Sequence, residues 1–240
     1  MSQKPPPKQF VKTPINGTNH TILVSSAKGG VGKSTFVSEF ADITGIKPLF
    51  ESVEDNPFLE PFFQDPKRWA YTLQSYFLYR RYKDHTTEGN IILDRSLYGD
   101  ICFANMLYKD GTLTQSEYEC YLTHYQTLEP LLPPVDLCII LNTSPEVALS
   151  RVRKRDRDFE TDLSLEYLRN LSSEIDLIPS RLRAETKVVQ LDWGEMTGNE
   201  ISKKCGEIVR SYFLDFFSLC FRRCCFLRFF SFSFFLLSFF

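Results

Sequence analysis

The feature that most constrains this chain is a glycine-rich segment, Ser25–Thr35, which directly follows the apolar run Thr21–Val24. Its sequence is Ser-Ser-Ala-Lys-Gly-Gly-Val-Gly-Lys-Ser-Thr. A buried strand that ends in such a turn presents successive backbone N–H groups to an anion, and the helix that follows opens with its positive end towards the same place. The segment therefore predicts a phosphate-binding loop and a protein that uses a nucleoside triphosphate.

The residues of this loop have separate roles in holding a triphosphate. Its glycines permit backbone angles and a close approach that side chains would block. In this pattern Lys33 reaches the β- and γ-phosphates, and the Ser34 hydroxyl ligates Mg²⁺. Ala27 stands where the pattern has its first glycine, which is the smallest change from glycine. The expected ATP-binding residues of the loop are Ala27, Lys28, Gly29, Gly30, Val31, Gly32, Lys33, Ser34 and Thr35.

The composition is that of a single α/β domain. A chain of 240 residues with 43% hydrophobic residues can form a substantial core. The formal net charge of −2 lacks the basic excess of nucleic-acid-binding proteins, so we expect no such partner. The 7 cysteines form no C-x-x-C pair, which favours reduced thiols over a zinc or disulfide framework. The N-terminus lacks an apolar export segment, and we expect a cytoplasmic protein.

Short apolar runs alternate with segments of helical length. The expected strands are 21–25, 48–50, 91–93, 137–141 and 188–191. The helical segments between them include 66–83, 98–108, 116–128 and 145–154. Such alternation predicts an α/β fold with a five-stranded parallel sheet flanked by helices. Because ligands of these sheets bind beyond the carboxyl ends of the strands, the residues that follow each strand are the candidates for chemistry.

The two ends of the chain differ from the part between them. Residues 1–19 are rich in proline and predict a flexible leader, whereas 20–209 hold the alternating pattern of the domain. Residues 210–240 form a hydrophobic tail rich in phenylalanine and cysteine. The uncharged stretch after Arg228 is shorter than the about 20 apolar residues of a membrane span. We favour an unselected extension over a membrane anchor, and both interpretations stay open.

Charged residues follow the second and third expected strands. Glu51 can accept the proton of a hydroxyl that attacks a γ-phosphate, which is the role of a general base. Asp94 suits Mg²⁺ or its water shell, and Arg95 offers a planar donor to a phosphate or to Glu51. The sequence thus predicts Glu51 and Arg95 as catalytic residues, and Ser34 with Asp94 as the metal site.

A basic run, Arg151–Arg157, follows the fourth strand and a short helix. Such a run is usually a solvated helix face. A phosphate loop elsewhere in the chain, however, needs cations that neutralise the charge developing in the transition state. We therefore expect this run, which includes Arg151, Arg155 and Arg157, to form an arginine-rich lid that closes over the phosphates of ATP.

Five ordered motifs resemble the deoxyribonucleoside kinase family. They are Glu51–Val53, Asn56–Gln74 with Arg81, Asp94–Asp100, Arg151–Glu160 and Leu165–Leu168. The similarity extends from about Thr21 to about Trp193. This resemblance implies a P-loop kinase fold and the ATP-dependent phosphorylation of a deoxynucleoside 5′-hydroxyl, a reaction of nucleotide salvage. It also implies a homodimer formed through helices on one face of the sheet.

The resemblance further assigns residues to the nucleoside. In that family the glutamate matched by Glu51 is the base for the 5′-hydroxyl, and the glutamine matched by Gln74 binds the nucleobase edge. Arg81 and Asp100 match the base-recognition pair of members that take purine deoxynucleosides or deoxycytidine, and Glu160 matches the lid acid that reads the 3′-hydroxyl. The implied substrate-binding residues are Glu51, Phe63, Trp69, Gln74, Arg81, Arg95, Asp100, Phe103 and Glu160.

Two alternatives share the phosphate loop. A nucleoside monophosphate kinase also has a basic lid, but its anionic acceptor needs extra cations after the second strand, where this chain has Glu51, Glu54 and Asp55. A partition-type ATPase, indicated by Lys28, has an aspartate cluster there and lacks the lid. We therefore expect ATP and Mg²⁺ as cofactors and a deoxynucleoside as the substrate. We expect a purine deoxynucleoside because Gln74, Arg81 and Asp100 supply paired hydrogen-bond donors and acceptors for the base. Deoxycytidine remains an alternative substrate.

Overall fold

A central sheet of five parallel strands organises the protein, with the strand order β2-β3-β1-β4-β5. The computed structural model describes residues 20–26, 32–51, 56–155, 164–194 and 198–224. The strands are β1 (Thr21–Ser26), β2 (Lys47–Leu49), β3 (Ile91–Asp94), β4 (Leu137–Asn142) and β5 (Lys187–Asp192). The expected parallel α/β fold is confirmed, and each strand lies within about one residue of its expected bounds.

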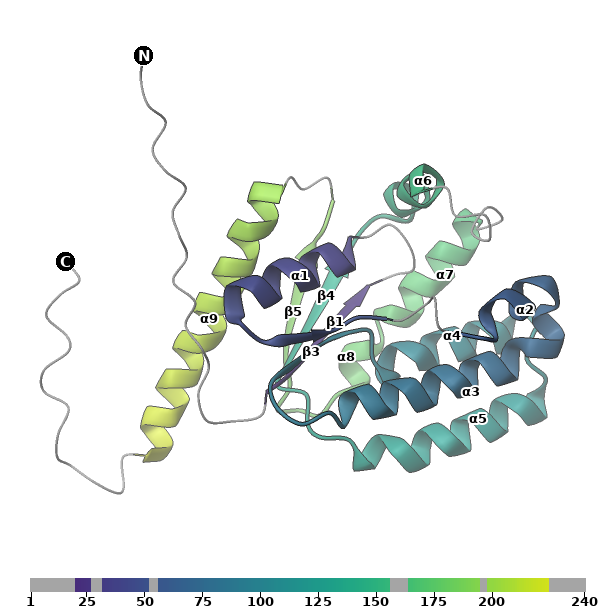
Figure 1. Cartoon of the computed structure of the whole chain (residues 1–240), viewed down its shortest axis with the longest axis horizontal. Coiled ribbons are helices and arrows are strands. Elements are labelled where there is room, and N and C mark those ends of the chain that lie inside the picture. The colour runs from purple at the N-terminus through teal and green to yellow at the C-terminus, as the bar shows by residue number, and fades with distance from the viewer. Residues whose placement is uncertain (1–19, 27–31, 52–55, 156–163, 195–197, 225–240) are drawn as a thin grey trace, which may run out of the picture.

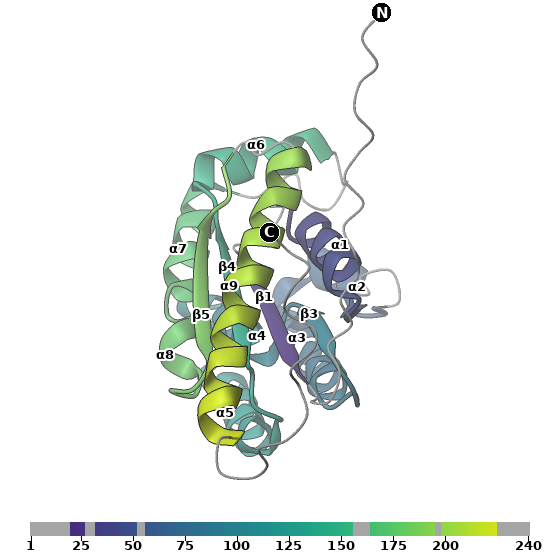
Figure 2. The ribbon, with the colours of Figure 1, turned by 90° about the vertical axis from the view of Figure 1, so that its left-hand side faces the viewer.

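Helices cover both faces of this sheet (Figure 1). They are α1 (Lys33–Thr44), α2 (Leu59–Gln64), α3 (Pro66–His85), α4 (Leu97–Lys109), α5 (Gln115–Leu128), α6 (Pro145–Arg155), α7 (Leu165–Ile175), α8 (Ile178–Arg181) and α9 (Gly198–Cys224). On one face α1 packs against α9, which crosses in front of the sheet in Figure 2. On the other face α4 packs against α3, α5 and α7.

The alternation of side chains along the strands divides the core into two clusters. Successive residues of a strand point to opposite faces. Leu23 accordingly packs with the cluster under α3, α4 and α7, whereas Ile22 and Val24 pack with the cluster under α1 and α9. All three side chains are fully buried. Because both faces are covered, the strands read as nearly continuous apolar runs, as the sequence indicated.

The two helices that border the site begin at clear capping residues. Asp65 accepts a hydrogen bond from the backbone N–H of Arg68 at 3.2 Å, and Pro66 opens α3, where its missing N–H costs nothing. Ser96 caps α4 and accepts from the N–H of Gly99 at 3.4 Å. These caps fix where α3 and α4 start, and α4 starts directly after the end of β3.

The C-terminal helix α9 continues past residue 209, where the sequence indicated the end of the domain. Its side chains Cys205, Ile208 and Tyr212 are buried in the second core cluster. The Tyr212 ring also lies edge-on to His20, with centroids 6.5 Å apart. In the parts of the chain that the structure describes, no helix is both long and apolar enough to cross a membrane.

Candidate active site

The exit of the phosphate-binding loop lies at the start of α1. Gly32 is the N-cap of this helix and has a φ of 80°, which favours glycine. Lys33, Ser34 and Thr35 form the first turn of α1. The expected loop residues Ala27, Lys28, Gly29, Gly30 and Val31 lie outside the described residues.

Lys33 and Ser34 both contact Asp94, the last residue of β3. The Lys33 Nζ forms an ion pair with Asp94 Oδ1, and the Ser34 hydroxyl donates to Asp94 Oδ2 at 2.8 Å. Parallel pairing places the end of β3 beside β1, and α1 packs against β3. The structure thus brings together the expected phosphate lysine and both expected metal ligands.

This pair of oxygen ligands fits Mg²⁺. The ion prefers oxygen donors and commonly binds only one or two protein groups, with water and phosphate as its other ligands. The Ser34 hydroxyl and the Asp94 carboxylate supply two such donors side by side. Among the described residues there is no group of three or more His, Cys, Asp or Glu side chains that could hold a metal ion. The donor set therefore matches a metal that completes its shell with a triphosphate.

Glu51 lies at the centre of the site, with an arginine on each carboxylate oxygen. Arg81, from α3, donates from Nη2 to Glu51 Oε1 at 2.6 Å. Arg95, which follows β3, places Nε 2.7 Å from Glu51 Oε2. The two expected catalytic residues are therefore in direct contact.

The backbone of Arg95 adopts an uncommon conformation that aims this side chain. Its φ is 95°, in a region that residues other than glycine rarely adopt and that costs about 1–3 kcal/mol. Its N–H donates to the carbonyl of Val24 at 3.3 Å, and its guanidinium lies 5.0 Å from the centre of the Phe103 ring. Contacts to two other elements thus hold Arg95 towards Glu51.

Electrostatics link the phosphate residues to this central carboxylate. Burial lowers the pKa of Lys33 to about 8, and the nearby positive charge of Arg95 acts in the same direction. The charges of Asp94 and Glu51 oppose the decrease. Because Lys33 interacts with Arg95 and Glu51 as well as with Asp94, the two groups of residues form one continuous charged site.

The expected base-recognition residues lie on α3 and at the start of α4. Gln74 and Arg81 are two turns apart on α3 and therefore share a face. Arg81 is 4% exposed, and its Nε lies 3.4 Å from Asp100 Oδ2 in the first turn of α4. Burial raises the pKa of Asp100 to about 6, against the lowering effect of Arg81 and Arg95. Arg81 thus joins Asp100 to Glu51.

Gln74 offers an acceptor that the protein does not use itself. The residue is 5% exposed, and its Oε1 has no hydrogen-bond partner among the described residues. A buried polar atom without a partner costs about 1–3 kcal/mol, so such atoms call for an explanation. A hydrogen-bond donor on a bound ligand would supply the missing partner.

The aromatic residues expected near the nucleoside divide into two groups. Phe103 touches the centre through its contact with Arg95. Trp69 instead stacks on Phe58, with centroids 6.0 Å apart, and Phe63 lies against Phe62 at 5.5 Å. The described contacts therefore bring Phe103 to the charged centre, whereas Trp69 pairs with Phe58 and Phe63 pairs with Phe62.

Two of the expected lid arginines, Arg151 and Arg155, lie in α6. Arg151 donates a hydrogen bond from Nη2 to the carbonyl of Gly194, just after β5. Arg155 ends α6, and the expected lid residues Arg157 and Glu160 lie outside the described residues. The described part of the lid thus touches the segment that follows the last strand.

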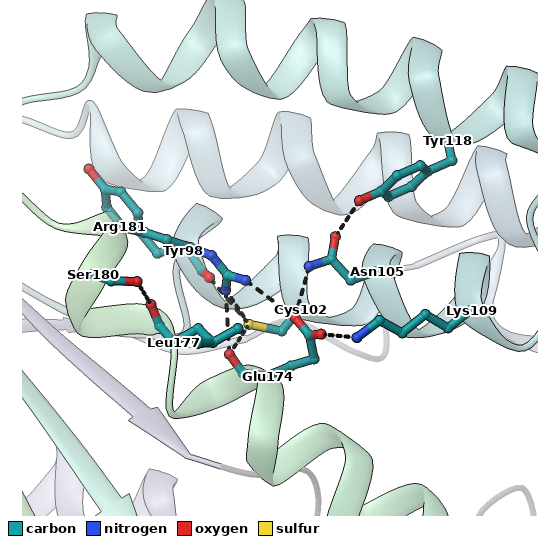
Figure 3. A network of polar contacts seen from close by, with 9 residues as sticks. All are labelled: Tyr98, Cys102, Asn105, Lys109, Tyr118, Glu174, Leu177, Ser180 and Arg181. Carbon is teal, nitrogen blue, oxygen red and sulfur yellow. Dashed lines mark hydrogen bonds and ion pairs between the residues drawn. The ribbon is translucent and has the colours of Figure 1, made fainter.

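A second polar cluster, centred on Glu174 of α7, was not anticipated from the sequence (Figure 3). Glu174 accepts hydrogen bonds from Asn105 at 2.8 Å, from Lys109 at 2.5 Å and from Arg181 at 3.2 Å. Tyr118 of α5 donates to Asn105 at 2.7 Å. Although burial alone would raise it, the pKa of Glu174 is lowered by hydrogen bonds from Lys109 and Asn105. The cluster connects α4, which carries Asp100, to α5, α7 and α8. Its members are far apart in the chain, so no sequence spacing predicts that they come together.

Comparison with known proteins identifies the family of this chain. The family model for deoxynucleoside kinases matches residues 28–212. A deoxyadenosine kinase of Dictyostelium discoideum is 33% identical over 199 residues, which cover 81% of this chain and 80% of that protein. A deoxyadenosine/deoxycytidine kinase of Bacillus subtilis (strain 168) is 35% identical over 155 residues, or 62% of this chain and 71% of that protein.

Solved structures extend the similarity to the fold. A deoxyadenosine kinase from M. mycoides, with the products dCMP and a flexible dCDP bound, superimposes with a TM-score of 0.71. It is 27% identical, and the match covers 80% of this chain and 98% of that one. The same kinase with dATP bound gives a TM-score of 0.69. From the family match, the identities and the shared fold, this chain belongs to the deoxynucleoside kinase family.

Proposed function

We propose that this protein transfers the γ-phosphoryl group of ATP to the 5′-hydroxyl of a purine deoxynucleoside. As a member of its family it is an enzyme that phosphorylates deoxynucleosides; the donor, the position of transfer and the base are the proposal. The observation that carries it is the place of Glu51. This carboxylate lies between the arginine that contacts Asp100 and the residues that meet at Asp94.

Glu51 acts as the general base in this proposal. Its carboxylate accepts the proton of the 5′-hydroxyl as the oxygen attacks the γ-phosphorus. The new O5′–P bond forms while the bond from the γ-phosphorus to the β,γ-bridging oxygen breaks, and ADP leaves. Arg95 holds Glu51 in place at 2.7 Å and balances the charge that develops on the transferred group.

The phosphate end supplies positioning and positive charge. Lys33 and the N–H groups at the start of α1 hold the β- and γ-phosphates, and Lys33 is predominantly charged at neutral pH because its pKa is about 8. A Mg²⁺ ion held by Ser34 and Asp94 would neutralise phosphate charge. Arg151, Arg155 and Arg157 complete the cation set from the lid, and Glu160 reads the 3′-hydroxyl.

The base end favours a purine. The Gln74 Oε1 has no partner in the described part of the chain, and Arg81 with Asp100 provides a donor next to an acceptor. A nucleobase edge that carries both donors and acceptors complements this set. The names of the relatives, which include deoxyadenosine kinase and deoxyguanosine kinase, support the same choice. Deoxycytidine is the second candidate, because one relative is a deoxyadenosine/deoxycytidine kinase.

The proposal extends to the setting of the enzyme. It acts in the cytoplasm, in the salvage of DNA precursors, and as a homodimer formed through helices on one face of the sheet. The family resemblance supports this assembly. Residues 210–240 take no part in the reaction, and membrane contact through them is not favoured.

A panel of nucleosides tests this function. The purified chain is incubated with ATP, Mg²⁺ and each of the four deoxynucleosides, and ADP formation is followed. We expect the highest kcat/KM for deoxyadenosine or deoxyguanosine, a lower value for deoxycytidine and the lowest for thymidine, with products that a 5′-nucleotidase cleaves. ADP formation at the same rate with and without a nucleoside would favour an ATPase switch. A higher kcat/KM for thymidine than for the purine deoxynucleosides would overturn the assignment of the base.

A further inference from the structure

Trp193, the first residue after β5, packs against the exit of the phosphate-binding loop. The side chain is 2% exposed, and its ring meets Phe36 of α1 edge-on with centroids 5.3 Å apart. A Cβ added to Gly32 would lie 3.1 Å from Trp193 Nε1. Glycine at position 32 is therefore needed twice, for its positive φ and for this close approach to the indole.

The backbone of Trp193 is held by the end of β4 and the residue that follows it. The N–H of Trp193 donates to the carbonyl of Asn142 at 2.6 Å. The Thr143 hydroxyl donates to the carbonyl of Trp193 at 2.9 Å. Because β4 is a central strand of the sheet, its end is a firm support. Trp193 is thus a fixed surface against which the loop exit rests.

The next residue connects the same segment to the lid. The carbonyl of Gly194 accepts a hydrogen bond from Arg151 of α6. Trp193 and Gly194 therefore touch the loop exit through the indole and the lid helix through the backbone. The proposed catalytic roles do not use either residue.

We propose that Trp193 is a positioning residue for the triphosphate and that the Trp193–Gly194 segment couples α6 to Gly32 and the start of α1. The inference rests on the proposed binding of ATP at this loop. Gly32 caps α1 without a side-chain cap, so the place of the following N–H groups and of Lys33 depends on where Gly32 rests. A shift of the loop exit moves all of these donors together, away from the phosphates.

The kinetic test separates the two substrates. Trp193→Leu removes the flat surface under Gly32, and Trp193→Phe keeps a ring. We expect Trp193→Leu to raise the KM for ATP by about tenfold or more, with a smaller rise in Trp193→Phe, while the KM for the deoxynucleoside changes by less than about twofold. Phe40→Leu is the matched control, because Phe40 is buried in the same cluster and stacks on Phe36 away from the loop.

A spectroscopic test does not depend on turnover. The chain has 2 tryptophans, so Trp69→Phe leaves Trp193 as the sole indole. We expect its fluorescence emission to change as ADP is titrated without nucleoside, and to saturate at the Kd that calorimetry gives. Arg151→Met, made in the same background, should shift the emission before any nucleotide is added, because the Gly194 carbonyl loses its donor.

The outcomes distinguish this inference from the proposed function. A parent enzyme that neither binds ADP nor phosphorylates nucleosides overturns the proposed function. A working parent whose Trp193→Leu variant keeps its KM for ATP, or raises both KM values equally, overturns the positioning role. If Trp193→Leu fails to fold, Trp193→Phe and the fluorescence titration decide: emission that stays constant while ADP binds contradicts the inference.

Discussion

At the scale of single residues, the site depends on a carboxylate shared by two arginines. The Glu51 carboxylate lies 2.6 Å from Nη2 of Arg81 and 2.7 Å from Nε of Arg95. Arg81 also faces Asp100. In the proposed reaction, binding of the base and activation of the hydroxyl would therefore both depend on the position of the Arg81 guanidinium.

The ionisation of Asp100 predicts a pH dependence of nucleoside binding. Its pKa is raised to about 6 by burial, so its carboxyl takes up a proton as the pH falls through 6 and loses its ion pair with Arg81. We expect the Kd of deoxyadenosine, measured by calorimetry without ATP, to increase about tenfold from pH 7 to pH 5 and to stay nearly constant from pH 7 to pH 8.

Asp100→Asn is the control for this pH dependence, because it keeps the shape of the side chain and cannot titrate. We expect weaker binding at neutral pH and a nearly flat profile below it. An unchanged slope in Asp100→Asn would assign the titration to another group. A Kd that decreases on acidification in the parent would show that protonated Asp100 is the form that binds.

Much of the charged centre follows from the sequence, for a physical reason. Parallel strands end at the same edge of a sheet, so the residues after the second and third strands had to meet near the loop. That rule identified Glu51, Asp94 and Arg95 without any distances. It contained nothing about the positive φ of Arg95 or the unpartnered Oε1 of Gln74, because both depend on contacts between elements far apart in the chain.

At the scale of secondary-structure elements, α4 is the helix on which the base end depends. One face presents Asp100 and Phe103 to the arginines, and the opposite part holds Asn105 and Lys109 against Glu174 (Figure 3). Helical periodicity predicted the place of α4. Its anchoring was not predictable, since the partners on α7 and α8 are more than sixty residues away.

Glu174→Ala tests this anchoring. The change leaves Arg181, which is 21% exposed, without its carboxylate. We expect the free energy of unfolding to decrease by about 2 kcal/mol. This is less than the cost of breaking a fully buried ion pair, because Lys109 is 69% exposed and its ion pair with Glu174 contributes little stability. In thermal unfolding this corresponds to a decrease in Tm of about 4–8 °C.

Glu146→Ala provides a matched control for that experiment. Glu146 pairs with Arg169 between α6 and α7 at 2.9 Å, but both side chains are more than half exposed. We expect a change in unfolding free energy within about 0.5 kcal/mol. Equal destabilisation by the two variants would mean that the buried cluster contributes no more than a surface ion pair.

At the scale of the whole molecule, the strand order brings the carboxyl ends of β1, β2 and β3 to the same edge of the sheet, where the site lies, with helices on both faces of the sheet (Figure 1). The alternation of apolar runs predicted this architecture because a parallel sheet buried on both sides requires it. The C-terminal boundary was harder to predict. Composition changes near residue 210, yet α9 continues through this point, and Tyr212 belongs to the core.

Two truncations test the role of the C-terminal region. A chain that ends at residue 224 keeps all of α9, and we expect unchanged phosphorylation, Tm and partition between buffer and lipid vesicles. A chain that ends at Cys205 loses Ile208 and Tyr212, each 7% exposed, and we expect it not to fold because these losses together exceed about 5 kcal/mol.

Either truncation can contradict this expectation. Reduced vesicle binding or activity in the chain that ends at residue 224 would give residues 225–240 a function. A folded, active chain ending at Cys205 would show that the second half of α9 contributes little to the core.

The most direct test of the whole account is the turnover of Glu51→Gln with ATP, Mg²⁺ and deoxyadenosine. The variant keeps the shape of the side chain and removes the group that accepts the proton. The exposed Glu60→Gln serves as the control. We predict that kcat decreases by about 10²–10⁴-fold in Glu51→Gln, with the Kd for ATP nearly unchanged and with Glu60→Gln equal to the parent. A Glu51→Gln enzyme that turns over at the parental rate would contradict the assignment of Glu51 as the base.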